Sequence, residues 1–185
     1  MTTFTLHTPE SAPAASRANL QAGLDRFGFV PNLYAHLAES PAALGAYFDI
    51  SARFEKTAFT PTERQVILLT ASVENGCGFC VAVHSMIARK MLKVADAVVD
   101  ALRAGKPIDE PRLQALSTFT RTMVIERGWV VGAPLEAFLA AGFTQQQALD
   151  VVLGVTMKTL SNYTNHLAQT PTNAEFADEA WTRPV

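Results

Sequence analysis

The chain has 185 residues, a length that suits a single domain. Hydrophobic residues make up 49% and charged residues 17%, and the formal net charge of −2 argues against a nucleic-acid-binding protein, which normally carries a basic patch. No apolar run reaches about 18 residues, so no membrane-spanning helix is expected.

Signals for starting and stopping helices follow one another along the chain, and no segment shows the alternation typical of a strand. Residues 1–15 lack periodicity and are expected to form a flexible or draped N-terminal arm. Ser16 is expected to cap a helix that runs to Phe27. Capping boxes at Thr60–Glu63 and Thr144–Gln147 predict helices over 61–74 and 144–168. Residues 171–185 are expected to be a C-terminal tail with little regular structure. The sequence therefore predicts an all-α domain of about seven or eight helices over residues 16–170.

The candidate chemistry lies in one short stretch, where Cys77 and Cys80 follow an Asn75-Gly76 break. A helix predicted over 77–91 turns about 100° per residue, so Cys77, Cys80 and His84 share one narrow face. The amides and dipole at a helix N-terminus stabilise a thiolate, which is the reactive form of cysteine. His84 lies one turn after Cys80 and is expected to exchange a proton with that thiol. The pattern predicts a redox-active dithiol.

Two other readings of this stretch stay open. A C-x-x-C pair is also common as half of a zinc site, but zinc needs two more ligands and only His84 has suitable spacing, so no metal or other cofactor is expected. Alternatively, both cysteines are buried and inert, since cysteine is among the most buried residue types. Two cysteines this close together are not the pattern of a disulfide-stapled secreted protein. With no signal peptide visible at the N-terminus, a reducing, cytoplasmic location is expected.

The stretch Thr60–Arg64, the Cys77-x-x-Cys80-x-x-x-His84 element and the upstream segment Phe27–Leu33 together resemble the alkylhydroperoxidase D-like (AhpD-like) branch of the carboxymuconolactone decarboxylase family, in particular its peroxidase-related members. The resemblance covers roughly residues 20–170. It implies an AhpD-like helical fold that assembles into a homotrimer or homohexamer, in keeping with the low charged fraction. It also implies a thiol peroxidase that reduces hydroperoxides and is recharged by a dithiol donor, such as a lipoyl-bearing or thioredoxin-like protein. In that family the second cysteine attacks the peroxide and the first resolves the product, which assigns these roles to Cys80 and Cys77.

The sequence departs from the family pattern at two positions of the proton relay. Gln65 stands where the family has a glutamate, and Phe79 stands where it has a histidine; neither side chain exchanges protons at neutral pH. Glu74 is a candidate replacement carboxylate, or else a solvated charge at a helix end. Asn162 and His166, on the last long helix, are candidates to reach the dithiol or to line a pocket with Phe79, or else make ordinary surface or buried polar contacts.

Two other functions compete with a thiol peroxidase. One is lactone or carboxylate chemistry, as in the decarboxylase members of the same family, which lack the paired cysteines. The other is a non-catalytic oligomeric module whose dithiol only senses redox state or stabilises the fold.

Overall fold

The computed structural model describes residues 4–184, which form nine α-helices and no strand. Residues 1–3 of the predicted arm and Val185 of the predicted tail lie outside the described residues. The all-α prediction is confirmed, with nine α-helices among the described residues where about seven or eight were expected. The α-helices are α1 (Arg17–Phe27), α2 (Asn32–Leu37), α3 (Pro41–Phe54), α4 (Pro61–Glu74), α5 (Gly78–Met86), α6 (Asp96–Arg103), α7 (Pro111–Ile125), α8 (Ala133–Ala140) and α9 (Gln145–Ala168).

The capping signals account for where the two central helices begin. At the start of α4, Glu63 N–H donates to the Thr60 hydroxyl and Thr60 N–H donates to the Glu63 carboxylate, at 3.2 and 2.8 Å. The same reciprocal pair forms between Thr144 and Gln147 at the start of α9. Both predicted capping boxes are therefore confirmed. Ser16 is different, because its hydroxyl donates to the Ala38 carbonyl at 2.7 Å and does not cap α1.

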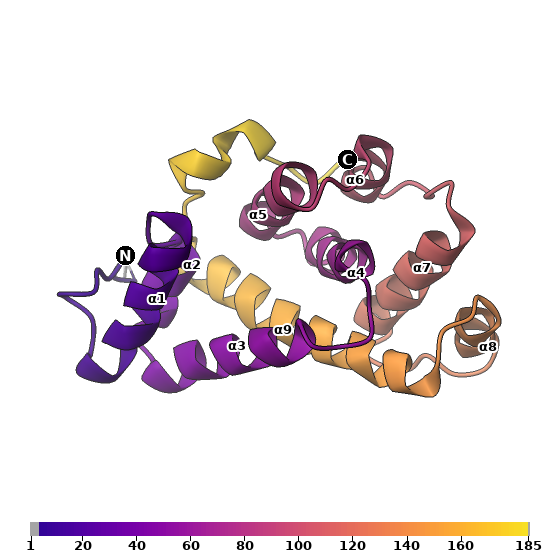
Figure 1. Cartoon of the computed structure of the whole chain (residues 1–185), viewed down its shortest axis with the longest axis horizontal. Coiled ribbons are helices and arrows are strands. Elements are labelled where there is room, and N and C mark those ends of the chain that lie inside the picture. The colour runs from indigo at the N-terminus through magenta and orange to yellow at the C-terminus, as the bar shows by residue number, and fades with distance from the viewer. Residues whose placement is uncertain (1–3, 185) are drawn as a thin grey trace.

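Helix α4 forms the centre of the molecule (Figure 1). It packs against α5, α6, α7 and α9, and its side chains are buried on nearly every side, as its apolar composition predicts. Helix α9 runs beneath it beside α3 (Figure 1). The close approach of α9 depends on Gly154, where a Cβ would stand 2.8 Å from a ring carbon of Phe54 and 2.9 Å from Ile67.

The chain turns from α4 into α5 at the Asn75-Gly76 break, where Gly76 has a φ of +70° that glycine adopts readily. Cys77 is the N-cap residue of α5, and Cys80 lies in its first turn. The α-helix ends at Met86 and continues as a π-helix through Ile87–Met91, so the predicted helix over 77–91 is present as two consecutive helical forms.

The C-terminal segment packs against α5, and its regular structure through residue 184 is limited to one short helix. It forms a 3-10 helix, η3 (Ala174–Glu179), and buries the ring of Phe176. The Trp181 indole N–H then donates to the Arg103 carbonyl at 2.9 Å. A Cβ on Gly78 would meet the Trp181 carbonyl at 2.9 Å, so the glycine between the two cysteines lets this segment lie directly over the start of α5. In the described part of the N-terminal arm, Ala12 is buried and His7 N–H donates to Ala35. No helix within residues 4–184 has the length and apolar character needed to cross a membrane.

Candidate active site

The structure brings the two cysteines together beneath a single amide group. Cys77 and Cys80 are both free thiols and almost completely buried. The Asn165 side-chain nitrogen, from α9, lies 3.3 Å from the Cys80 sulfur and 3.7 Å from the Cys77 sulfur. The sulfurs therefore occupy the same side of the α5 N-terminus, the arrangement that their spacing predicts.

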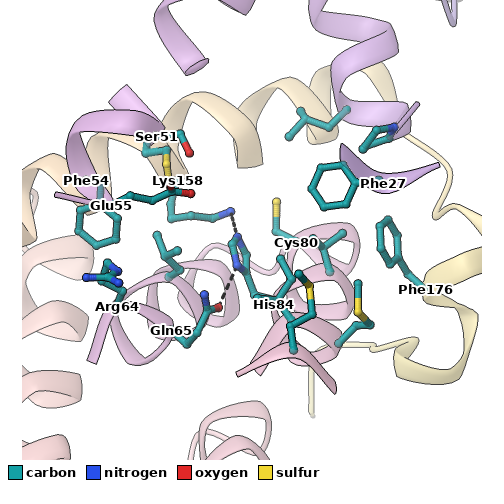
Figure 2. A pocket seen from close by; sticks show the side chains of 18 of the residues that line it. Phe27, Ser51, Phe54, Glu55, Arg64, Gln65, Cys80, His84, Lys158 and Phe176 are labelled. Atoms are coloured by element: carbon teal, nitrogen blue, oxygen red, sulfur yellow. Dashed lines mark hydrogen bonds between the residues drawn. The ribbon is translucent and has the colours of Figure 1, made fainter. Parts of the chain in front are cut away.

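A cavity of about 400 Å³ leads to Cys80 but not to Cys77. Its polar wall includes Gln65, Cys80, His84 and Lys158 (Figure 2). The rest of its lining is mostly apolar, with aromatic rings from five different elements: Phe27, Tyr34, Tyr47, Phe54, Phe79 and Phe176. Small molecules can therefore reach the Cys80 sulfur, while the Cys77 sulfur lies behind it.

A buried lysine contacts His84 in the wall of the cavity. Lys158, from α9, is 1% exposed, and its Nζ lies 3.0 Å from His84 Nε2. His84 Nδ1 lies 3.1 Å from Gln65 Oε1 (Figure 2). The Gln65 oxygen only accepts hydrogen bonds, so His84 carries its proton on Nδ1 and its Nε2 accepts from the ammonium. No ion pair between Lys158 and a carboxylate forms among residues 4–184.

The surroundings of Cys80 stabilise its charged form. Burial alone would raise the pKa of Cys80, but a hydrogen bond from Cys77 and the positive charge of Lys158 outweigh it and lower that pKa to about 5. Donating this hydrogen bond raises the pKa of Cys77, and burial and the neighbouring thiolate raise it further. The pair therefore consists of a thiolate at Cys80 and a thiol at Cys77 at neutral pH.

The proton exchange expected between His84 and Cys80 is replaced by a different contact. Burial and the charge of Lys158 lower the pKa of His84 well below its usual value, so its ring is neutral. Both ring nitrogens are already engaged, one by Gln65 and the other by Lys158. His84 therefore orients the ammonium, and Lys158 is the charged group next to the thiolate.

Of the other two residues predicted near the dithiol, Phe79 lines the pocket and Glu74 lies outside it. Phe79 lines the pocket and packs edge-on against Phe176, with ring centroids 6.1 Å apart. Glu74 points instead toward α7, where its carboxylate pairs with Arg121 at 2.7 Å. It is therefore neither a replacement for the relay carboxylate nor an unpaired charge at a helix end.

The two polar candidates on α9 contact groups other than the sulfurs. Asn162 is buried, and its side-chain oxygen accepts from Asn75 at 2.9 Å, which ties the turn before α5 to α9. His166 is exposed and stacks loosely on Tyr163. Neither side chain lines the pocket that reaches Cys80.

Sequence reasoning missed the most consequential residue of the site. Lys158 is the one charged residue between Asp150 and the end of α9 at Ala168, leaving histidine aside. It shares a helical face with Ser161 and Asn165, at spacings of three and seven residues. A lone lysine in the middle of an otherwise apolar and uncharged segment was the available signal.

Comparison with known proteins agrees with this geometry. Residues 38–122, which include α4, both cysteines and His84, match the carboxymuconolactone decarboxylase family. The structure is also similar to an alkylhydroperoxidase AhpD core, an uncharacterized peroxidase-related protein from Ralstonia eutropha JMP134, with a TM-score of 0.82 and 26% sequence identity over 95% of this chain and 96% of that one. Residues 38–122 thus match the carboxymuconolactone decarboxylase family, and the fold as a whole is similar to that of an AhpD core.

Two more distant structures share the family fold. An uncharacterized peroxidase-related protein from Silicibacter sp. TM1040 superposes with a TM-score of 0.78 at 19% identity, over 94% of this chain and 91% of that one. The debrominase Bmp8 superposes with a TM-score of 0.80 at 15% identity, over 97% and 96% of the two chains. A variant of Bmp8 has been solved in complex with 2,3,4-tribromopyrrole. No curated protein matches the chain significantly. Members with this fold therefore differ in the reactions named for them.

Proposed function

We propose that this protein is a thiol-dependent oxidoreductase that reduces hydroperoxides, with Cys80 as the attacking residue and Cys77 as the resolving one. The observation that carries the proposal is the asymmetry of the pair. Cys80 lines a cavity and its pKa is lowered by Cys77 and Lys158, whereas Cys77 lies outside that cavity and its pKa is raised. A reactive thiolate accessible to a small molecule, with a thiol directly behind it, is what the two-step chemistry needs.

The reaction divides into two balanced steps. The Cys80 thiolate attacks the terminal oxygen of a hydroperoxide, ROOH, which breaks the O–O bond, oxidises Cys80 to a sulfenic acid and releases RO⁻, which takes up a proton to become ROH. The Cys77 thiol then attacks that sulfenic acid, forming the disulfide and releasing water. A dithiol donor reduces the disulfide by exchange and is itself oxidised to a disulfide.

The burial of the site limits which dithiol donor can reduce the Cys77–Cys80 disulfide. Cys77 is buried, and the C-terminal segment covers the start of α5. A dithiol on a slender arm, such as a lipoyl group, can enter a cavity of about 400 Å³, whereas a thioredoxin-like protein would have to displace the covering segment. A lipoyl-bearing protein is therefore the favoured donor, and a reducing, cytoplasmic location suits a cycle that regenerates free thiols.

The lining of the pocket favours one second candidate. Six aromatic rings surround the approach to Cys80, and the fold is that of a debrominase whose variant was solved with a tribromopyrrole. In a reductive dehalogenation, the Cys80 thiolate takes the halogen from an aromatic carbon, which gains a proton. Cys77 then forms the disulfide and releases the halide. Release of bromide from a brominated pyrrole, dependent on both cysteines, distinguishes this reaction from peroxide reduction.

We also propose that the chain functions as a homo-oligomer, a trimer or a hexamer. Large apolar side chains project from the outer side of α9, where Leu149, Tyr163 and Leu167 are 71%, 60% and 72% exposed. Together with Val152 they define an apolar strip along the helix. Single exposed apolar residues are common on soluble proteins, but several that lie side by side are typical of a surface that contacts another chain.

Mass spectrometry after peroxide treatment tests the principal function. The reduced protein should lose two thiols for each hydroperoxide consumed and gain a crosslink between Cys77 and Cys80, which dihydrolipoamide reverses. Cys80→Ser should consume no peroxide, and Cys77→Ser should stop at a sulfenic acid on Cys80. Oxidation no faster than in a urea-denatured control would support the redox-inert or sensing reading. Unchanged turnover of a lactone substrate by a variant lacking both cysteines would support the decarboxylase reading.

A further inference from the structure

The proposed peroxide reduction lacks an evident proton donor. When the O–O bond breaks, the departing RO⁻ is a strong base, so a positioned acid is needed for rapid cleavage. Gln65 and Phe79 have no proton to give at neutral pH. His84 is neutral, and its one N–H faces Gln65. Cys77 holds the proton that leaves as water in the second step.

Lys158 is the acidic group that the cavity offers. Its ammonium lines the same cavity as the Cys80 sulfur (Figure 2), and its positive charge lowers the pKa of Cys80. Only one of its protons is directed at His84 Nε2, which leaves others for the sulfur and for a bound substrate. Its stem emerges from the same helix as Asn165, so the ammonium and the amide approach Cys80 from one rigid element.

No other negative group competes for this charge. The titratable or charged side chains that face the cavity from the surrounding helices and their ends are Arg26, Tyr34, Tyr47, Glu55, Arg64, Cys80 and His84. Burial raises the pKa of both tyrosines, which stay neutral. Glu55, the one carboxylate among them, is 55% exposed and pairs with Arg26 at 3.5 Å. The Cys80 thiolate is thus the counter-ion of a lysine that is 1% exposed.

We propose that Lys158 is a further catalytic residue, which holds Cys80 as a thiolate and then donates a proton to the oxygen that leaves when the O–O bond breaks. The step balances as Cys80–S⁻ + ROOH + Lys158–NH₃⁺ giving Cys80–SOH + ROH + Lys158–NH₂. The neutral amine regains its proton from water in the cavity. Gln65 and His84 are positioning residues, because they act by fixing the direction of the ammonium. This role rests on the proposed function, but the pairing of Lys158 with Cys80 does not.

The first experiment measures the pairing alone, by the rate at which iodoacetamide alkylates Cys80 in the reduced protein. Lys158→Met removes the charge and keeps an apolar side chain of similar length. Measured at a series of pH values, the half-maximal pH of alkylation reports the pKa of Cys80, and in this variant it should rise from about 5 toward about 8.5, the value of an ordinary thiol. Lys158→Arg keeps the charge and should leave the half-maximal pH close to that of the wild-type protein. The same half-maximal pH for the wild-type protein and Lys158→Met would overturn the proposal.

The second experiment isolates proton donation, at a pH near 9.5 where the thiolate is largely formed in every variant. Sulfenic acid formation with tert-butyl hydroperoxide should remain at least about tenfold slower in Lys158→Met and Lys158→Arg, since the guanidinium is too weak an acid to donate. Peracetic acid releases acetate, which needs no proton, so the variants should react with it about as fast as the wild-type protein. A deficit of the same size with both oxidants would refute proton donation.

The two proposals fail in different ways. If the wild-type protein alkylates rapidly but reacts with neither oxidant, the proposed function is wrong and the ion pair stands. Circular dichroism and thermal unfolding of each variant verify that it is folded. Replacing a buried charge by methionine is compatible with a stable core. If Lys158→Met nevertheless fails to fold, Lys158→Gln, which is neutral and polar, undergoes the same two measurements with the same expected deficits.

Discussion

The two sides of α9 differ from those of an ordinary surface helix. The inner side carries Lys158, Ser161 and Asn165 beside its apolar residues, and these three are at most 5% exposed. The outer side carries Leu149 and Leu167, which are more than 70% exposed. A helix normally turns its apolar side to the core and its polar side to water. Both departures from that pattern fit the proposed chemistry at Cys80 on the inner side and the proposed contact with another chain on the outer side.

The largest effect is expected when a negative charge is placed on the inner side of α9, next to the sulfurs. Asn165→Asp puts a carboxylate next to both sulfurs, where a like charge raises the pKa of Cys80. A rise of about two units moves the half-maximal pH of alkylation by iodoacetamide from about 5 to about 7. The matched control is His166→Asp, which puts the same charge one residue along on the exposed side. A comparable shift in both variants would show that the inner side has no special relation to the sulfurs.

On the outer side the expected effect is on assembly. The double variant Leu149→Glu, Leu167→Glu should dissociate the oligomer into monomers of 20.0 kDa, as measured by light scattering after size exclusion. Repulsion and lost apolar burial both oppose contact between charged strips. Alkylation of Cys80 should be unchanged. Gln146→Glu, an exposed polar position on the same helix, controls for added charge. A wild-type protein that is itself monomeric would refute the reading of the outer side.

The thiolate on the inner side also predicts a pH dependence of stability. The pKa of Cys80 is about 5 in the folded chain and about 8.5 when unfolded. The unfolded state binds the extra proton between these values, so the free energy of unfolding of the reduced protein should rise from pH 5 to about 8.5. Above that pH the free energy of unfolding should fall, because the raised pKa of Cys77 lets the folded state keep a proton that the unfolded state loses. Urea unfolding at a series of pH values measures both slopes, and Cys80→Ser should flatten the first. An equally steep rise in that variant would contradict the assignment.

The smallest effect concerns how closely α9 is held. Gly154→Val places methyl groups against Phe54 and Ile67, where even a Cβ is within 2.9 Å of both side chains. Overpacking of this kind costs about 1–3 kcal/mol of unfolding free energy. Gly45→Ala, in α3, meets no atom within 4 Å and should instead stabilise the protein by about 0.5–1 kcal/mol. The unfolding temperature should therefore fall for Gly154→Val and rise for Gly45→Ala. A rise in both variants would show that α9 has room for a side chain at Gly154.

Most of the helical framework was predictable because its signals are local. The capping boxes at Thr60 and Thr144 involve residues three apart, and the Cys77–Cys80 spacing places both sulfurs on one side of a helix whatever surrounds it. The predicted cap at Ser16 was wrong because its hydroxyl donates to the Ala38 carbonyl, 22 residues away. No local sequence pattern encodes that contact.

The parts that could not be predicted depend on contacts distant in sequence. Lys158 and His84 are in contact although they are 74 residues apart in sequence. Glu74 and Arg121 form an ion pair although they are 47 residues apart. The ordered C-terminal segment is fixed by two isolated aromatic residues, Phe176 and Trp181, which have no periodic neighbours. Gln65 and Phe79 show from the sequence that two proton-relay residues of the family are absent, but only tertiary packing places Lys158 in the same cavity.

The most direct test of the account is the pH profile of Cys80 alkylation in the reduced wild-type protein, with the modified cysteine located by mass spectrometry. The account predicts a half-maximal rate near pH 5 and modification of Cys80 with Cys77 left intact. A half-maximal rate near pH 8.5, the value of an ordinary thiol, or equal modification of the two cysteines, would contradict the buried pairing of Lys158 with a Cys80 thiolate.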